Sequence, residues 1–99
     1  MMEFSFSGEI WYWRGPSPFY FVTMPEDQCR ELHEVSAAVS YGWGCVPVTV
    51  TLGDTTWRTS MFPKDGRYIV PLKAKVRRAE DVDEGMVVDL QLEVDAVPA

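Results

Sequence analysis

The chain has 99 residues, of which 46% are hydrophobic and 13% aromatic, and its formal net charge is −6. This length allows one domain of ordinary size, and the composition is that of a folded chain rather than a disordered one. No apolar run approaches the roughly 20 residues that a membrane-spanning helix needs. The chain starts without a basic segment ahead of an apolar one, so we expect no secretory signal and a cytoplasmic location. Two cysteines do not make a disulfide framework.

Basic residues are concentrated in one part of the chain. Residues 58–78 contain seven Lys or Arg and one acidic residue, Asp65, a local charge of +6, whereas the remainder carries −12. The acidic remainder repels polyanions at long range, but a local basic patch can attract a phosphate, an acidic protein or the acidic face of a second copy. A solvated surface that keeps the protein soluble is the simpler interpretation of the same pattern.

The N-terminal segment alternates between apolar and polar residues. This period predicts a half-buried strand at residues 3–13 whose inner face carries Phe4, Phe6, Ile10 and Tyr12. Gly8 falls on the same face and indicates a bulge or a close approach of another part of the chain. A turn at 15–18 leads into a second strand at 19–22, so we expect a hairpin.

A helical period follows. Pro25 suits the first turn of a helix, and the acidic residues Glu26 and Asp27 favour its positive end. Apolar residues then recur at helical spacing, which predicts an amphipathic helix that lies on a sheet and ends near the glycines at 42 and 44.

The second half of the chain contains the remaining strands. Alternation and turn residues predict strands at 46–52, 55–61, 67–70 and 88–94. A loop is expected at 62–66, and Pro71 is expected to open a short helix whose inner face carries Leu72, Val76 and Ala79. About six strands with segregated helices favour a small, mostly antiparallel barrel, since closure removes exposed strand edges.

Three strings, WRTSMFP at 57–63, GRYIVPLK at 66–73 and VR at 76–77, resemble the bacterial family of domains of unknown function DUF1905. The similarity covers roughly residues 4–94 and implies one domain over residues 1–99. It also implies a double-split β-barrel, of the same broad class as the AbrB and MazE DNA-binding domains, and assigns no activity. The chain departs from those DNA-binding families after Gly85, where Met86 replaces their usual Asp.

Candidate catalytic groups are sparse. Ser60 is the obvious nucleophile to test, but it has no G-x-S-x-G context, and the chain's one histidine is His33. Cys29, His33 and Cys45 could supply three soft ligands to zinc, whereas a structural zinc site takes four. We therefore expect no catalytic residue, metal or cofactor, and favour a protein that is not an enzyme.

The basic segment favours a binding site instead. Lys73 and Arg77 are four residues apart on the expected short helix, and a helix that opens at Pro71 would aim free amides at an anion. An aromatic-walled pocket with cations at its mouth is typical of a site for a small anion. We predict a non-catalytic site for a small anion or an acidic protein surface, formed by Trp57, Arg58, Ser60, Lys73 and Arg77.

Two questions stay open on the sequence. The alternative function is a nucleic-acid-binding regulator of AbrB type that acts as a homodimer. The fold analogy favours it, and the pI of about 4.6 opposes it.

Trp11 and Trp13 share the polar face of the first strand. They either form an interface or ligand pocket, or lie under the long helix.

Overall fold

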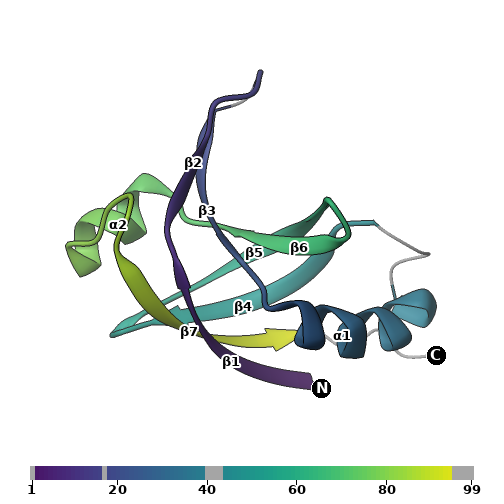
Figure 1. The fold of residues 1–99 in the computed structure, drawn as a ribbon. Helices are drawn as coiled ribbons and strands as arrows, with labels where there is room; N and C mark the ends of the chain where they lie inside the picture. The colour runs from purple at the N-terminus through teal and green to yellow at the C-terminus, as the bar shows by residue number, and fades with distance from the viewer. Residues whose placement is uncertain (1, 17, 40–43, 95–99) are drawn as a thin grey trace.

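The computed structural model describes residues 2–16, 18–39 and 44–94, with the backbone alone for 35–39. This part of the chain forms seven strands and two helices, arranged as in Figure 1. In chain order they are β1 (Met2–Glu9), β2 (Trp11–Trp13), β3 (Phe19–Thr23), α1 (Glu26–Val39), β4 (Val46–Leu52), β5 (Thr55–Lys64), β6 (Arg67–Pro71), α2 (Ala74–Glu80) and β7 (Val87–Val94).

The two end strands of the sheet are consecutive in the chain. The antiparallel order is β1-β7-β4-β5-β6-β3-β2, so β1 pairs with β7 while β2 pairs with β3. Ile10 separates the two strands and bonds to the loop before β7, donating its N–H to Met86 O and accepting from the Gly85 N–H. One segment therefore supplies both edges, and the sheet curls into a small barrel (Figure 1). The predicted small antiparallel barrel is confirmed, with the expected first strand divided at Ile10.

Strand β5 also changes its pairing partner partway along its length. Its residues 55–61 pair with β4, and its residues 62–64 pair with β6. The barrel thus consists of two halves, β1-β7-β4 and β6-β3-β2, which are joined through the β1–β2 segment and through β5. This is the double-split arrangement that the family resemblance implied.

The expected loop at 62–66 is wrong for its first three residues. Phe62, Pro63 and Lys64 continue β5, opposite Ile69, Tyr68 and Arg67. The connection is a turn at Asp65 and Gly66, both of which have positive φ angles, of 51° and 77°. Gly66 adopts this angle without strain, which allows the hairpin to close over two residues.

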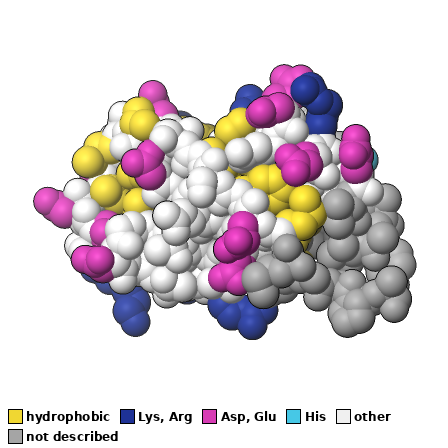
Figure 2. All heavy atoms as spheres, turned by 90° about the horizontal axis from the view of Figure 1, so that it is seen from below, with side chains coloured by type: hydrophobic (Ala, Val, Ile, Leu, Met, Phe, Trp, Pro, Cys, Tyr) yellow, Lys and Arg dark blue, Asp and Glu magenta, His cyan; other side chains and the backbone are white. Residues whose placement is uncertain are grey.

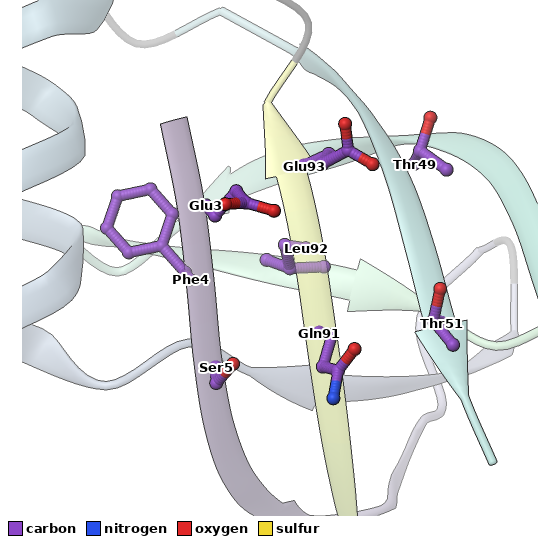
Figure 3. Close-up of a pocket in the computed structure, with 8 residues that line it drawn as sticks. All are labelled: Glu3, Phe4, Ser5, Thr49, Thr51, Gln91, Leu92 and Glu93. Atoms are coloured by element: carbon purple, nitrogen blue, oxygen red, sulfur yellow. The ribbon is translucent and has the colours of Figure 1, made fainter. Parts of the chain in front are cut away.

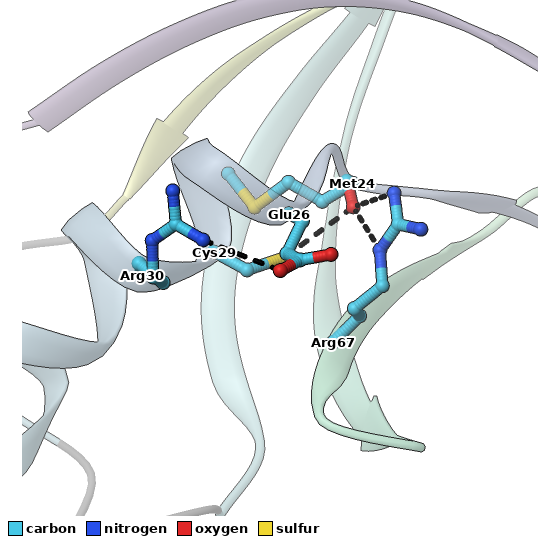
Figure 4. Close-up of polar contacts among 5 residues, drawn as sticks. All are labelled: Met24, Glu26, Cys29, Arg30 and Arg67. Carbon is cyan, nitrogen blue, oxygen red and sulfur yellow. Dashed lines mark hydrogen bonds and ion pairs between the residues drawn. The ribbon is translucent and has the colours of Figure 1, made fainter.

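Helix α1 begins one residue after Pro25, as predicted, and its start is fastened to β6. The Arg67 guanidinium donates from Nε and Nη2 to Met24 O at 3.0 and 2.8 Å, and the Cys29 thiol donates to the same carbonyl at 3.3 Å (Figure 4). Glu26 and Arg30 form an exposed ion pair one turn apart. Cys29 and Leu32 are buried, so this helix closes the side of the barrel opposite α2 (Figure 1).

Helix α2 begins later than predicted. Pro71 is the last residue of β6, opposite Phe21, and the next N–H, that of Leu72, donates to Tyr20 O. Strand pairing therefore keeps the chain extended through Lys73, whose φ and ψ are −69° and 157°, and the helix starts at Ala74. The expectations that Pro71 opens the helix and that Ala79 faces inward are wrong, because Ala79 is exposed. Neither helix of the described residues is long and apolar enough to cross a membrane.

Candidate functional site

A second apolar cluster covers the outer face of β2, β3 and β6. Trp11 and Pro71 both lie opposite Phe21, on the face of the sheet that points away from the core. Phe21 is nevertheless 4% exposed and Ile69 1% exposed. Aromatic neighbours cover Phe21, because its ring centroid lies 5.4, 5.8 and 5.8 Å from those of Trp11, Trp13 and Phe19. These contacts are within the range of favourable aromatic pairs.

A groove of about 560 Å³ runs over this cluster to the point where β5 and β6 separate. We call it the aromatic groove. Its walls include Trp13 and Phe62, whose side chains are 36% and 39% exposed. The groove is lined by Trp13, Pro18, Phe19, Phe21, Thr59, Phe62 and Pro71. Of the two interpretations of Trp11 and Trp13, the structure therefore supports an exposed pocket, since α1 lies elsewhere (Figure 1).

Thr59 lies where the aromatic groove reaches the wall of the barrel. The inward-facing residues of β5 are Trp57, Thr59 and Met61, which lie opposite Val50, Val48 and Val46 of β4. All of them are buried except Thr59, which is half-buried and lines the aromatic groove. The groove thus extends from the outer aromatic cluster to the edge of β5.

The described residues that line the groove are uncharged, and Lys64 lies at its margin. Lys64 Nζ is 5.0 Å from the ring centroid of Trp13, a distance at which a cation and an aromatic face attract. The same ammonium pairs with Asp65 at 3.2 Å. A neighbouring hollow of about 320 Å³ is lined by Trp11, Thr23, Lys64, Asp65, Arg67 and Ile69. An anionic group at this margin would meet Lys64 beside an apolar floor.

The predicted binding residues lie in three places. Trp57 is buried in the core, and its indole N–H has no hydrogen-bond partner within the described residues. Arg58 is exposed on the outer face of β5 opposite Thr49, and Ser60 is half-buried opposite Pro47. Neither of these two side chains lines the aromatic groove.

The other two predicted binding residues lie at the start of α2 and on its surface. Lys73 is the exposed residue before the helix and makes no side-chain capping bond. Arg77 packs its guanidinium 3.7 Å from the Tyr20 ring centroid and donates from Nε to Leu72 O at 3.2 Å. Arg77 therefore ties α2 to β3, and the five predicted residues do not converge on one pocket.

The two cysteines differ in environment. Cys45 is exposed, whereas Cys29 is buried and its sulfur accepts the Tyr68 N–H at 3.4 Å. Burial raises the pKa of the Cys29 thiol above its ordinary value, although the bond from Tyr68 acts in the opposite direction. In the described part of the chain, no three His, Cys, Asp or Glu side chains are arranged to hold a metal ion.

A polar hollow of about 340 Å³ lies on the outer face of β1, β7 and β4 (Figure 3). Glu3 and Glu93 are directly opposite each other there, and Thr49 faces Glu93 from the other side. Figure 2 shows the molecule from below, with acidic side chains scattered over this view and Lys and Arg confined to its rim. Two carboxylates make this hollow unfavourable for an anion, so the aromatic groove is the better candidate site.

Sequence reasoning missed the groove because its residues come from separate segments. The period of two in the N-terminal strand did place Trp11 and Trp13 together on one face. It did not show that Phe19 and Phe21 would face the same way or that Phe62 would lie in a strand. The hairpin register of Trp11 with Phe21 and of Trp13 with Phe19 supplies that information.

The model of the family DUF1905, described as a domain of unknown function, matches residues 6–92 of the chain. The match includes every residue that lines the aromatic groove. No curated protein matches the chain at a significant level.

Proposed function

Because the chain belongs to the DUF1905 family, whose description assigns no activity, we propose a function from the site itself: the protein is a non-catalytic binding module that holds its ligand in the aromatic groove. The ligand joins an apolar group to a negative charge, as an acidic protein surface or a small aromatic anion does. The observation that carries this proposal is the solvent-open groove, with Trp13 and Phe62 exposed on its walls and Lys64 against Trp13. Apolar pockets with few polar groups are typical of binding sites.

The lining supports binding rather than catalysis. Among the described residues that line the groove, Thr59 carries the one hydroxyl, and none is a histidine, cysteine or carboxylate that could act as a general base. The surrounding charge supports an anionic ligand. Lys64 lies against Trp13 at the margin of the groove, and none of the described residues that line the groove is acidic.

An aromatic sulfonate, 1-anilinonaphthalene-8-sulfonate, tests this site because it combines two ring systems with one negative charge. We expect its fluorescence to rise on addition of the folded protein. Phe62→Ala and Trp13→Ala should each weaken binding by about tenfold, since each removes exposed apolar contact area worth about 1–2 kcal/mol. Lys64→Gln should weaken binding of the sulfonate but not of N-phenyl-1-naphthylamine, which has no charge.

Val87→Ala is the matched control, because Val87 is an exposed apolar residue, at 67% exposure, that does not line the groove. Circular dichroism and thermal unfolding of each variant establish that it is folded. Equal weakening by Val87→Ala and Phe62→Ala would mean that the dye binds apolar surface at large, and the proposed site would then be wrong. No binding at dye concentrations up to about 1 mM would have the same consequence.

A further inference from the structure

Thr59 is a polar residue at an inward-facing position of β5. The inward-facing residues on either side of it along the strand, Trp57 and Met61, are buried and hydrophobic, and so is Val48, which lies opposite it on β4. Thr59 itself is half-buried and lines the aromatic groove. Valine has nearly the same branched shape without the hydroxyl, so packing alone does not account for a polar side chain at this position.

The Thr59 hydroxyl has no protein partner within the described residues. Other threonine hydroxyls do: Trp11 Nε1 donates to Thr23 Oγ1 at 2.8 Å, and Thr55 Oγ1 donates to Glu80 Oε2 at 2.6 Å. Among the residues that the structure describes, Thr59 Oγ1 makes no such contact. An open groove lets solvent pair with this hydroxyl, and a ligand that fills the groove would displace that solvent.

The hydroxyl therefore restricts the ligand. A purely apolar ligand would leave Thr59 Oγ1 without a partner, and sites that contain a buried hydrogen-bonding group reject ligands that lack the matching group. The described lining residues are uncharged, so an ionised group beside Thr59 would lose its water without gaining a counter-charge. The ligand atom that meets Thr59 must be polar and neutral.

We propose that Thr59 selects ligands that carry a neutral hydroxyl on an aromatic ring, as a phenol does. The walls favour a ring, because Trp13, Phe21 and Phe62 offer it aromatic faces and edges. A hydroxyl can either donate to Thr59 Oγ1 or accept from it. The inference rests on the proposed function and narrows its ligand: the negative charge stays at the margin of the groove, and the hydroxyl enters beside Thr59.

Two naphthoates that differ at one ring position test this proposal, 6-hydroxy-2-naphthoate and 6-methyl-2-naphthoate. They have the same charge at about pH 7 and similar size, but the methyl compound cannot form the hydrogen bond. Each is titrated into the full protein with bound 1-anilinonaphthalene-8-sulfonate, and its affinity is read from displacement of the dye. The measured quantity is the preference, which is the ratio of the two affinities.

Variants of Thr59 identify the source of that preference. Thr59→Val keeps the shape and removes the hydroxyl, so the preference for the hydroxy compound should fall by about fivefold, the factor that one hydrogen bond contributes. Thr59→Val should bind the methyl compound at least as tightly as the unaltered protein does, which verifies that the groove is intact. Thr59→Ala should lower the preference in the same way, and Thr59→Ser should change it by less than about twofold.

Thr49→Val is the matched control, because Thr49 is a strand threonine on β4 that does not line the groove. It should leave both affinities unchanged. Phe62→Ala should weaken both compounds, since both occupy the groove.

The outcomes separate this inference from the proposed function. If the dye and both naphthoates bind, and the preference is the same with and without the Thr59 hydroxyl, the role of Thr59 is wrong and the binding module stands. If the dye binds and neither naphthoate displaces it, the ligand class is wrong. If neither the dye nor a naphthoate binds, both proposals are wrong. An equal loss of preference in Thr59→Val and Thr59→Ser, or affinities that Phe62→Ala leaves unchanged, would also overturn the assignment to Thr59.

Discussion

A Cβ atom on Gly8 would lie 2.7 Å from Cγ1 of Val22, which is closer than side-chain carbons pack in proteins. Gly8 is in β1 and Val22 in β3, so this contact lies where the N-terminal segment leaves β7 and turns towards β3. The sequence indicated either a bulge or a close approach at Gly8, and the structure shows the close approach.

Gly8→Ala should therefore destabilise the fold. Val22 is fully buried, and an added methyl group in a packed interior typically costs about 1–3 kcal/mol. We expect a decrease of this size in the free energy of unfolding, measured by urea denaturation. The exposed residue Ser5, on the same strand, provides the control, and Ser5→Ala should change it by less than about 0.5 kcal/mol.

Val22→Ala identifies the cause of that destabilisation. Val22→Ala removes the methyl group that the new Cβ would meet. The double variant Gly8→Ala/Val22→Ala should therefore be more stable than the sum of the two single changes in free energy of unfolding predicts. Simple additivity would show that Gly8→Ala acts through the backbone rather than through Val22.

Arg77 packs against the fold whereas Lys73 is exposed, so replacing each of them should affect the free energy of unfolding differently. Arg77→Ala removes the contact with the Tyr20 ring and the bond to Leu72 O, and should lower the free energy of unfolding by about 1–2 kcal/mol. Lys73→Ala removes an exposed side chain without a capping bond and should change it by less than about 0.5 kcal/mol. Thermal or urea unfolding measures both. Equal effects would contradict the packing role of Arg77.

The fold could be predicted from local patterns because most strands have one buried face. In β4, Val46, Val48 and Val50 alternate with Pro47, Thr49 and Thr51, and all three valines are buried as expected. The failures occur where strand pairing overrides a local signal. Pro71 has the φ angle of a helix start, but its position opposite Phe21 keeps it in a strand.

The candidate site was harder to predict, because it depends on register between distant segments. The basic segment at 58–78 looked like one patch along the chain, yet its members point in different directions. Arg67 donates to Met24 O at the start of α1, whereas Arg77 lies on Tyr20. Alternation alone could identify Trp57 as inward-facing, and its burial follows from its position opposite Val50.

The two thiols should react at very different rates. Exposed Cys45 should be modified rapidly by a disulfide reagent such as dithiobis-nitrobenzoate at pH 8, and buried Cys29 only when the protein unfolds. One equivalent of released thiolate in buffer and two in denaturant would verify this. Rapid release of two equivalents from the folded protein would contradict the burial of Cys29.

The raised pKa of Cys29 has a consequence for stability. Because the folded state holds the thiol proton more tightly than the unfolded state, the stabilisation is complete below the ordinary thiol pKa of 9.0 and is lost as the pH rises above it. Urea unfolding at several pH values between about 7 and 10 measures this loss, because free thiols ionise within that range. Cys29→Ala should remove this part of the pH dependence, and Cys45→Ser should leave it unchanged.

Duplex DNA should bind weakly, which tests the regulator hypothesis. High non-specific affinity requires several cations on one face, and each phosphate contact adds about 0.9 to the salt dependence of log K. In this protein, Arg67 and Arg77 make contacts that hold parts of the fold together. Anisotropy of labelled random duplex should therefore show no micromolar binding at low salt. Micromolar binding that weakens steeply with salt would instead favour a regulator, because the remaining cations would then be neutralising phosphates despite the net charge of −6.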